Sequence, residues 1–257
     1  MKTYRIGQIV PSSNVTMETE IPAIFRARES IAPERFTFHS SRMRMKQVRK
    51  EELAAMDADS GRCAAELSDA RVDVLGYACL VAIMSTGLGY HRVSERALTQ
   101  VTAENGAAAP VVTSAGALVS ALRLLGARTV TVVCPYLRPL TDTVVEYIRH
   151  EGVAVSDYTA LEIPDNLDVA AHDPAKLVPI ARGLDNSDAD VIVLSACVQM
   201  PSLESIEVVE RELGKPVVSA SIATAFHLMR ALDLPAVAPG AGTLLSGRYA
   251  DADPGSC

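Results

Sequence analysis

The stretch VIVLSACVQMP at residues 191–201 decides the fold when it is compared with VLGYACLVA at residues 74–82. Each begins as an apolar run of the kind that forms a buried parallel strand, and each run ends in a small residue followed by a cysteine. A turn and a helix-like pattern follow in both places. Because Cys79 and Cys197 lie in different halves of the 257-residue chain, the sequence suggests a duplication that gives each half one thiol.

Strand-like and helix-like segments alternate around these two stretches, and the pattern restarts near Thr129. Such alternation predicts an α/β protein with two parallel sheets, each with helices on both faces. The predicted strands are Arg5–Val10, Arg35–Ser41, Val72–Tyr77, Pro110–Thr113, Thr129–Cys134, Val153–Tyr158, Asp190–Ser195 and Pro216–Ser219. The predicted helices are Thr16–Arg28, Glu51–Ala70, Tyr90–Glu104, Ala115–Leu125 with Ser114 as its cap, Thr141–Glu151, Pro174–Leu184, Leu203–Leu213 and Ser221–Leu232.

Composition and charge exclude several classes of function. The formal net charge is −7 and there is no lysine-rich or arginine-rich tract, which argues against nucleic acid and anionic membranes as partners. No apolar stretch is long enough to span a bilayer, and no signal peptide is visible at the start. The five cysteines show neither a C-x-x-C motif nor zinc-ligand spacing, so we expect reduced thiols in the cytoplasm and no bound metal.

Polar residues follow several of the predicted strands. Ligands of parallel sheets bind outside the carboxyl ends of the strands. Side chains from separate loops should therefore converge at that edge of each sheet. If the two halves face each other, they meet in one cleft. These residues are Asn14, Cys79, Tyr136, Asn166 and Cys197.

The opening stretch VPSSNVTME at residues 10–18 resembles the start of maleate cis-trans isomerases and the related arylmalonate decarboxylases. The two cysteine loops resemble the paired loops of the cofactor-independent aspartate/glutamate racemase superfamily. The resemblance covers roughly Arg5 to Leu245. It implies two pseudo-symmetric Rossmann-like lobes, each with a four-stranded parallel sheet, and an active site in the cleft between them. By this resemblance the N-terminal lobe comprises residues 1–114 and 219–257, and the C-terminal lobe comprises residues 115–218.

The resemblance also implies roles for the site residues. Asn14, Tyr136 and Asn166 would hold substrate carboxylates, and Cys79 and Cys197 would do the chemistry. Our own hypothesis is that Cys79, in an all-apolar loop, is the nucleophile, and that Cys197, flanked by Ser195 and Gln199, is the acid/base partner. No cofactor is implied. The decarboxylases have a glycine where Cys79 stands, so this thiol argues against simple decarboxylation.

The activity that the resemblance implies is cis-trans isomerisation of a small dicarboxylate, maleate to fumarate, and two thiols can carry it out. A thiolate adds to one alkene carbon, the former double bond rotates, and elimination of the thiolate gives the trans isomer. The nucleophile should then have a lowered pKa, which a helix N-terminus or a cluster of backbone N–H groups provides. We expect backbone N–H groups around Leu80, Val81 and Val198 to help neutralise the dianionic substrate.

Two alternatives stay open. An amino-acid racemase of the aspartate/glutamate type would use the same thiols for proton transfer, and a carboxylate-binding protein without catalysis would need neither. A homo-oligomer, most simply a dimer, is also expected.

Other residues are predicted to have structural roles or to lie at the surface. Cys63 and Cys134 are predicted to be buried apolar residues and Cys257 a tail thiol, while His39 and His91 are surface or structural residues, and Arg42, Arg44 and Lys46 belong to a solvated loop.

Overall fold

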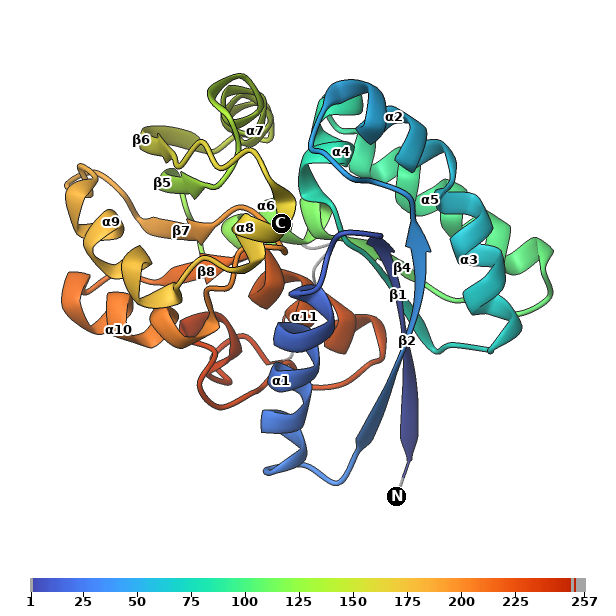
Figure 1. Ribbon diagram of the computed structural model, residues 1–257. Coiled ribbons are helices and arrows are strands. Elements are labelled where there is room, and N and C mark those ends of the chain that lie inside the picture. The colour runs from blue at the N-terminus through green and yellow to red at the C-terminus, as the bar shows by residue number, and fades with distance from the viewer. Residues whose placement is uncertain (1, 251, 253–257) are drawn as a thin grey trace.

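The computed structural model describes residues 2–250 and 252, and Cys257 lies outside this range. The chain forms two four-stranded sheets, in the strand orders β2-β1-β3-β4 and β6-β5-β7-β8, and all neighbouring strands are parallel (Figure 1). The strands are β1 (Thr3–Pro11), β2 (Arg35–Met43), β3 (Val74–Tyr77), β4 (Val111–Thr113), β5 (Thr129–Cys134), β6 (Ala154–Ala160), β7 (Val191–Ser195) and β8 (Val217–Ser219). The identical order of the two sheets confirms the predicted α/β fold and its duplication.

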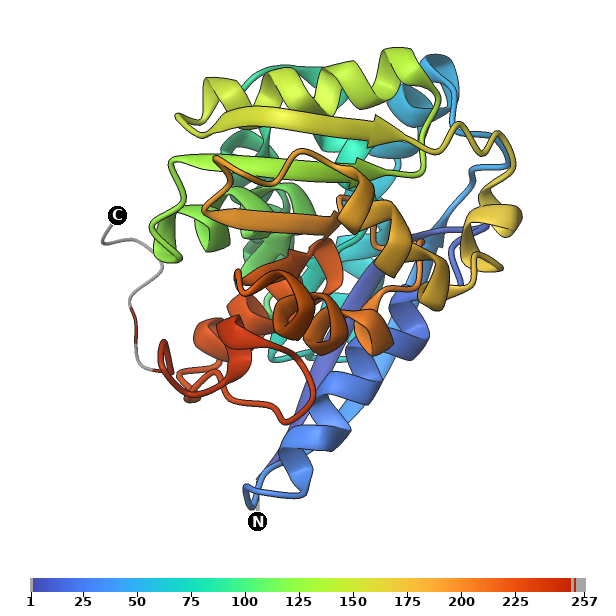
Figure 2. The same ribbon diagram turned by 90° about the vertical axis from the view of Figure 1, so that its left-hand side faces the viewer.

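Helices connect the strands and cover the sheets on both faces, as Figure 2 shows for the second sheet. The α-helices are α1 (Met17–Glu29), α2 (Lys50–Ala58), α3 (Ser60–Asp69), α4 (Leu80–Thr86), α5 (Tyr90–Glu104), α6 (Ser114–Leu124), α7 (Arg138–His150), α8 (Asn166–Ala170), α9 (Leu177–Gly183), α10 (Leu203–Leu213) and α11 (Ala220–Ala231). Short 3-10 helices lie at Pro174–Lys176 and Thr243–Leu245.

The third strand of each sheet, β3 or β7, is buried along its whole length. Strands covered on both faces must be apolar throughout, which is why VLGY and VIVLS read as continuous hydrophobic runs rather than as alternating ones. Each of these strands pairs on one side with the first strand of its sheet and on the other with the fourth. The residues that follow β3 and β7 therefore emerge near the middle of each sheet edge.

The last long helix returns to the first sheet. Helix α11 packs on α1, β3 and β4, and it also contacts α6. The division into residues 1–114 with 219–257 and residues 115–218 stays a prediction, and this packing supports it. A second link joins the halves: the buried carboxylate of Glu151, just after α7, pairs with Arg92 of α5 at 2.6 Å and with Arg123 of α6. These two guanidinium groups hold the pKa of Glu151 at about 2.

Several predicted helix boundaries were wrong. The helix expected over Glu51–Ala70 is two helices that meet at Asp59, where the Ser60 hydroxyl donates to the Asp57 carbonyl at 2.6 Å and Gly61 lowers helix propensity. Ser114 is the first residue of α6 rather than its cap. Thr113 caps α6 by accepting from the Gly116 N–H at 3.0 Å, and Ser219 caps α11 in the same way.

Three further segments differ from the prediction. The short helix α4, which ends with Ser85 and Thr86, is absent from the predicted helices. The short helix α8, which Asp165 caps, is also absent from them. Strand β2 runs on through Arg42 to Met43, so Arg42 lies in a strand and not in a solvated loop.

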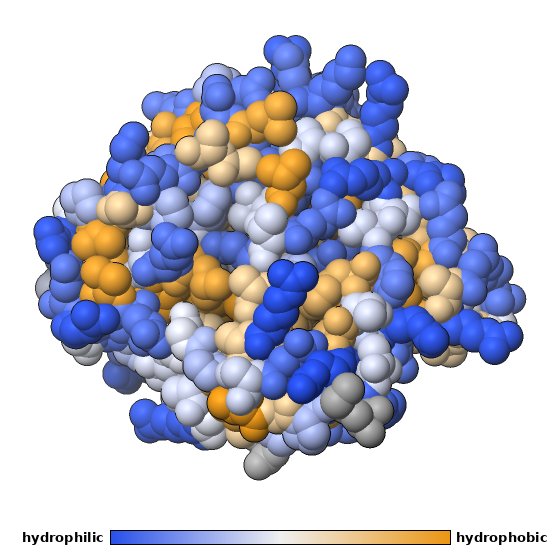
Figure 3. All heavy atoms as spheres, turned by 60° about the horizontal axis from the view of Figure 1, so that its bottom comes forward, coloured by the Kyte–Doolittle hydropathy of each residue, from blue (hydrophilic) through white to orange (hydrophobic). Residues whose placement is uncertain are grey.

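The outer surface mixes residue types: on the face drawn in Figure 3, hydrophilic and hydrophobic residues are interspersed. Within residues 2–250, no helix has the length and apolar character needed to cross a bilayer.

Candidate active site

The carboxyl ends of β1, β3, β5 and β7 meet around one small cavity. It contains most of the predicted site residues, including both thiols. Leu80 is the exception, because it is fully buried at the start of α4 and does not line the cavity. The lining residues are Pro11, Asn14, Met45, Val48, Cys79, Val81, Tyr136, Asn166, Cys197, Val198 and Gln199.

Cys79 lies between β3 and α4 in a left-handed backbone conformation, with φ of +94° and ψ of +69°. A residue with a Cβ pays a steric cost of roughly 1–3 kcal/mol in such a sparsely populated region. The turn is held in place because the Ala78 N–H donates to the Ile9 carbonyl at 2.9 Å, next to the cysteine. A strained backbone at a cysteine that lines a cavity is consistent with a turn that orients the thiol toward that cavity.

Burial governs the acidity of this thiol. Only 8% of Cys79 is exposed, and desolvation raises its pKa to about 12, although the Ala82 N–H opposes the shift. The expectation of a lowered pKa was therefore wrong for the protein without substrate, because desolvation outweighs the single backbone donor. Cys79 rests as a neutral thiol near neutral pH and needs a base to become a nucleophile.

The backbone strain at Cys79 leads to a stability prediction. Cys79→Gly should be more stable than Cys79→Ala, by about 1 kcal/mol, because glycine adopts φ near +94° without a Cβ clash whereas alanine keeps the strain. Urea unfolding of the two variants measures this difference directly. Equal midpoints, or a more stable alanine variant, would show that the left-handed turn carries no strain.

Cys197 faces the same cavity from the end of β7, and only 5% of it is exposed. The Gln199 N–H donates to its sulfur at 3.4 Å, and the Met200 N–H and the Tyr136 hydroxyl also lower its pKa. Burial nevertheless raises the pKa of Cys197 above the ordinary thiol value. The Ser195 hydroxyl fixes the turn by donating to the Cys197 carbonyl at 2.8 Å.

The two thiols are electrostatically coupled. A thiolate at Cys197 raises the pKa of Cys79 further, so the pair holds at most one negative charge over a wide pH range. That charge is stabilised better at Cys197, which has three hydrogen-bond donors against one at Cys79. Once Cys197 is ionised, the pair therefore combines one thiol with one acceptor of its proton.

The two predicted asparagines enter the cavity from loops of opposite sheets, and both are buried. The Asn14 side-chain oxygen accepts from the Met17 N–H at 3.0 Å at the start of α1, which turns its NH₂ group away from that helix. Asn166 donates its NH₂ group to the Ser13 hydroxyl at 2.8 Å. The Tyr136 hydroxyl lies 3.2 Å from the Ala196 carbonyl oxygen and is also within reach of the Cys197 thiol.

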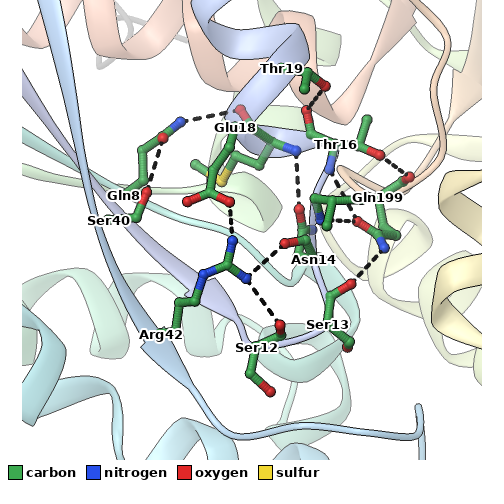
Figure 4. Close-up of polar contacts among 12 residues, drawn as sticks. Gln8, Ser12, Ser13, Asn14, Thr16, Glu18, Thr19, Ser40, Arg42 and Gln199 are labelled. Carbon is green, nitrogen blue, oxygen red and sulfur yellow. Dashed lines mark hydrogen bonds and ion pairs between the residues drawn. The ribbon is translucent and has the colours of Figure 1, made fainter.

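Sequence reasoning missed two side chains that build the site. The Arg42 guanidinium donates to the carbonyls of Ser12 and Asn14, each at 3.0 Å, and pairs with Glu18, so it braces the Asn14 loop from β2 (Figure 4). Gln199 crosses from the Cys197 loop to that same loop. No local pattern in the sequence identifies either contact.

The remaining candidates lie outside the cavity. Cys63 and Cys134 are fully buried, in line with the apolar role predicted for them. His91 is buried against the Tyr147 hydroxyl at 2.5 Å, and burial lowers its pKa to about 4. His39 contacts the Thr37 hydroxyl on the partly buried strand β2. In the described part of the chain, no group of three or more His, Cys, Asp or Glu side chains is arranged to hold a metal ion.

Several known proteins are similar to this chain in sequence and in fold. The arylmalonate decarboxylase family model matches residues 6–245. A maleate isomerase of Pseudomonas putida is 67% identical over 96% of this chain and 98% of that protein. The crystal structure of an alanine variant of a Pseudomonas putida maleate isomerase with maleate is 65% identical, covers 96% of this chain and 98% of its own, and superposes with a TM-score of 0.95.

A third relative carries chemical information. It is a cysteine-to-serine mutant of the Nocardia farcinica maleate cis-trans isomerase with a covalently bound succinylcysteine intermediate. It is 49% identical, with a TM-score of 0.91, over 95% of this chain and 98% of that one. These matches confirm the resemblance that the opening motif and the paired cysteines indicated. The chain belongs to the maleate isomerases, within the arylmalonate decarboxylase family.

Proposed function

We propose that this protein converts maleate to fumarate through a covalent adduct on Cys79, with Cys197 moving the proton. The observation that carries the proposal is the pair of buried thiols, one from each sheet, across a cavity that also contains three carboxamides and a phenol. The relative with a succinylcysteine intermediate supports the covalent route.

The proton cycle follows from the acidities of the two thiols. The Cys197 thiolate accepts the proton of Cys79 as the Cys79 sulfur forms a bond to one alkene carbon. The electron pair of the broken π bond moves to the neighbouring carbon, which takes the proton from Cys197 and leaves a succinyl group on Cys79. After rotation about the new single bond, Cys197 removes a proton from that carbon and the Cys79 sulfur leaves as a thiolate. Cys197 then returns this proton to the Cys79 sulfur, so both thiols regain their starting state.

Neutral donors must hold the substrate carboxylates in this scheme. The lining contains no charged side chain among the described residues, so Asn14, Tyr136 and Asn166, with backbone N–H groups near Val81 and Val198, are the proposed carboxylate partners. Fixed dipoles in a water-poor cavity stabilise developing negative charge strongly, at about 2–4 kcal/mol for one donor.

The same lining argues against the racemase alternative. An amino-acid substrate carries an ammonium group, which needs a carboxylate or several well-placed carbonyl oxygens. The cavity lining has no Asp or Glu among the described residues. A non-catalytic binding protein would not need two thiols at the ends of equivalent strands, one of them in a strained turn.

The pH dependence tests the role of Cys197. Activity should rise as pH increases through the ionisation of Cys197, because the thiolate is the proposed base. Tyr136→Phe removes a donor that lowers the pKa of this thiol, so the ascending limb of the kcat/KM profile should move to higher pH and the rate below the limb should fall. Initial rates across a pH series measure this. A limb that stays in place or moves to lower pH would contradict the assignment.

Proton NMR of purified, reduced protein mixed with maleate tests the function itself. The maleate vinyl signal should be replaced by that of fumarate without any added metal or cofactor. An unchanged spectrum would contradict the proposal. The racemase alternative instead predicts loss of optical rotation from aspartate or glutamate.

Two broader expectations accompany this function. Thiol chemistry needs reduced cysteines, so we propose a reducing compartment such as the cytoplasm. A homodimer also stays a prediction. Leu88, just before α5, and Val93, within α5, are both about half exposed and are apolar residues that a partner subunit would cover.

A further inference from the structure

The side-chain amide of Gln199 is the most heavily bonded group near the cavity. Its oxygen accepts from the backbone N–H groups of Val15 at 2.9 Å and Thr16 at 3.3 Å. Its nitrogen donates to the backbone carbonyls of Ser13 at 2.9 Å and Asn166 at 2.8 Å. Figure 4 shows this amide reaching across to the backbone on both sides of Asn14.

These four contacts match a carboxamide and no other side chain. The group has two acceptor sites on oxygen and two N–H donors on nitrogen, and all four are used. The partners also fix which end is oxygen, because two are donors and two are acceptors. A carboxylate in this place would lose both donors and face two carbonyl oxygens.

The partners of Gln199 are the backbone groups that place the two asparagines. Ser13 and Val15 flank Asn14, and the Asn166 carbonyl belongs to the second asparagine itself. The backbone N–H of Gln199 donates to the Cys197 sulfur at 3.4 Å. One residue thus connects the Asn14 loop, the Asn166 loop and the Cys197 loop.

The fold has other anchors in the same region. The Thr16 hydroxyl donates to the Gln199 carbonyl at 2.7 Å, a contact that does not need the Gln199 side chain. Glu20, from α1, accepts from the N–H groups of Ser202 at 2.6 Å and Leu203 at 2.7 Å at the start of α10. The Cys197 loop therefore stays attached to the first sheet when the amide is removed.

We propose that Gln199 is a positioning residue, whose side chain sets the distance of Asn14 and Asn166 from Cys197 and so shapes the carboxylate-binding sites; this rests on the proposed function. It acts through the two asparagines and through its own backbone N–H. Its removal should weaken substrate binding and misplace Cys197 relative to the substrate, while the fold persists.

The test compares Gln199→Met, which keeps the length and loses all four hydrogen bonds, with a matched control. Asn186 lies before β7, away from the cavity, and also uses a side-chain amide to bridge three groups. It accepts from Thr131 at 2.7 Å and donates to the carbonyls of Ala181 at 2.7 Å and Leu184 at 3.0 Å. Asn186→Ala loses a comparable network with no effect on the site.

Both variants should lower Tm. Gln199→Met should in addition raise KM for maleate about tenfold and lower kcat by about 10–100-fold, because small misplacements of binding groups have large kinetic effects. Asn186→Ala should keep the KM and kcat of the unmodified protein. Gln199→Asn, which retains the carboxamide on a shorter side chain, should fall between these results and replaces Gln199→Met if that variant does not fold. Unchanged KM and kcat in a folded Gln199 variant would overturn the proposal.

A second readout does not depend on maleate turnover. In a Cys79→Ser background, the rate of Cys197 alkylation by iodoacetamide across a pH series reports the ionisation of this thiol. Adding Gln199→Met should move that ionisation to higher pH, because the Gln199 N–H leaves the sulfur, whereas Asn186→Ala should not move it. If the unmodified protein fails to isomerise maleate, the proposed function is wrong. The alkylation profiles still test whether Gln199 affects the ionisation of Cys197. Identical pH profiles of alkylation with and without Gln199→Met would contradict the proposed effect of Gln199 on the ionisation of Cys197.

Discussion

Cys79→Ser is expected to lower kcat/KM for maleate by at least about 10³-fold, because losing a group that forms the covalent intermediate removes the reaction path rather than one stabilising contact. A serine hydroxyl is far less acidic than a thiol, and the Cys197 thiolate is too weak a base to ionise it. Initial rates followed by fumarate formation measure the loss.

The control for this variant is Cys63→Ala. Cys63 is as fully buried as the catalytic candidate, but it packs in α3, away from the cavity lining. Its replacement should reduce stability and leave kcat and KM unchanged in the protein that folds. Normal turnover by Cys79→Ser would contradict the assignment of Cys79 as nucleophile.

Cys197→Ala is expected to stop the reaction after addition. Without Cys197 no base lies beside the succinyl carbon, so elimination is slowed more than addition, which water and the substrate can still assist. Steady-state turnover should fall by at least about 10³-fold, while maleate is consumed in an amount close to that of the protein. The succinylcysteine intermediate seen in a cysteine-to-serine mutant of the Nocardia farcinica enzyme fits this expectation.

The two cysteine variants should therefore differ in how much maleate they consume and in whether they form an adduct. Cys79→Ser should neither consume maleate nor form an adduct, whereas Cys197→Ala should consume about one equivalent and then stall. Rapid-quench measurements of maleate and fumarate separate these patterns. Complete loss of maleate consumption in Cys197→Ala would mean that addition itself needs the second thiol.

The sequence predicted the α/β fold and its duplication because the information is local and repeated. Runs such as residues 74–77 and 191–195 are apolar throughout only when both faces of a strand are covered, and their recurrence in each half revealed the duplication. Since both thiols follow equivalent strands, their convergence on one cavity followed from the fold. Element boundaries were less predictable: Thr113 and Ser114 are both good caps, and only the backbone geometry distinguishes them.

The parts of the site that the sequence did not reveal depend on long-range contacts. Gln199 bonds to Val15, which is 184 residues away along the chain, and Arg42 reaches the carbonyl of Asn14 from a neighbouring strand. Neither contact leaves a periodic or spaced signal. The acidity of Cys79 was misjudged for a related reason, since a helix start is visible in the sequence but the depth of burial that opposes it is not.

The most direct test of the account is to locate the covalent bond. Purified Cys197→Ala is mixed with maleate, quenched in acid, digested and analysed by peptide mass spectrometry. The account predicts that the peptide containing Cys79 gains the mass of one maleic acid and that no other cysteine peptide is modified. The same mass gain on a cysteine other than Cys79, or an adduct on Cys197 in the Cys79→Ser variant with turnover retained, would contradict covalent catalysis at Cys79.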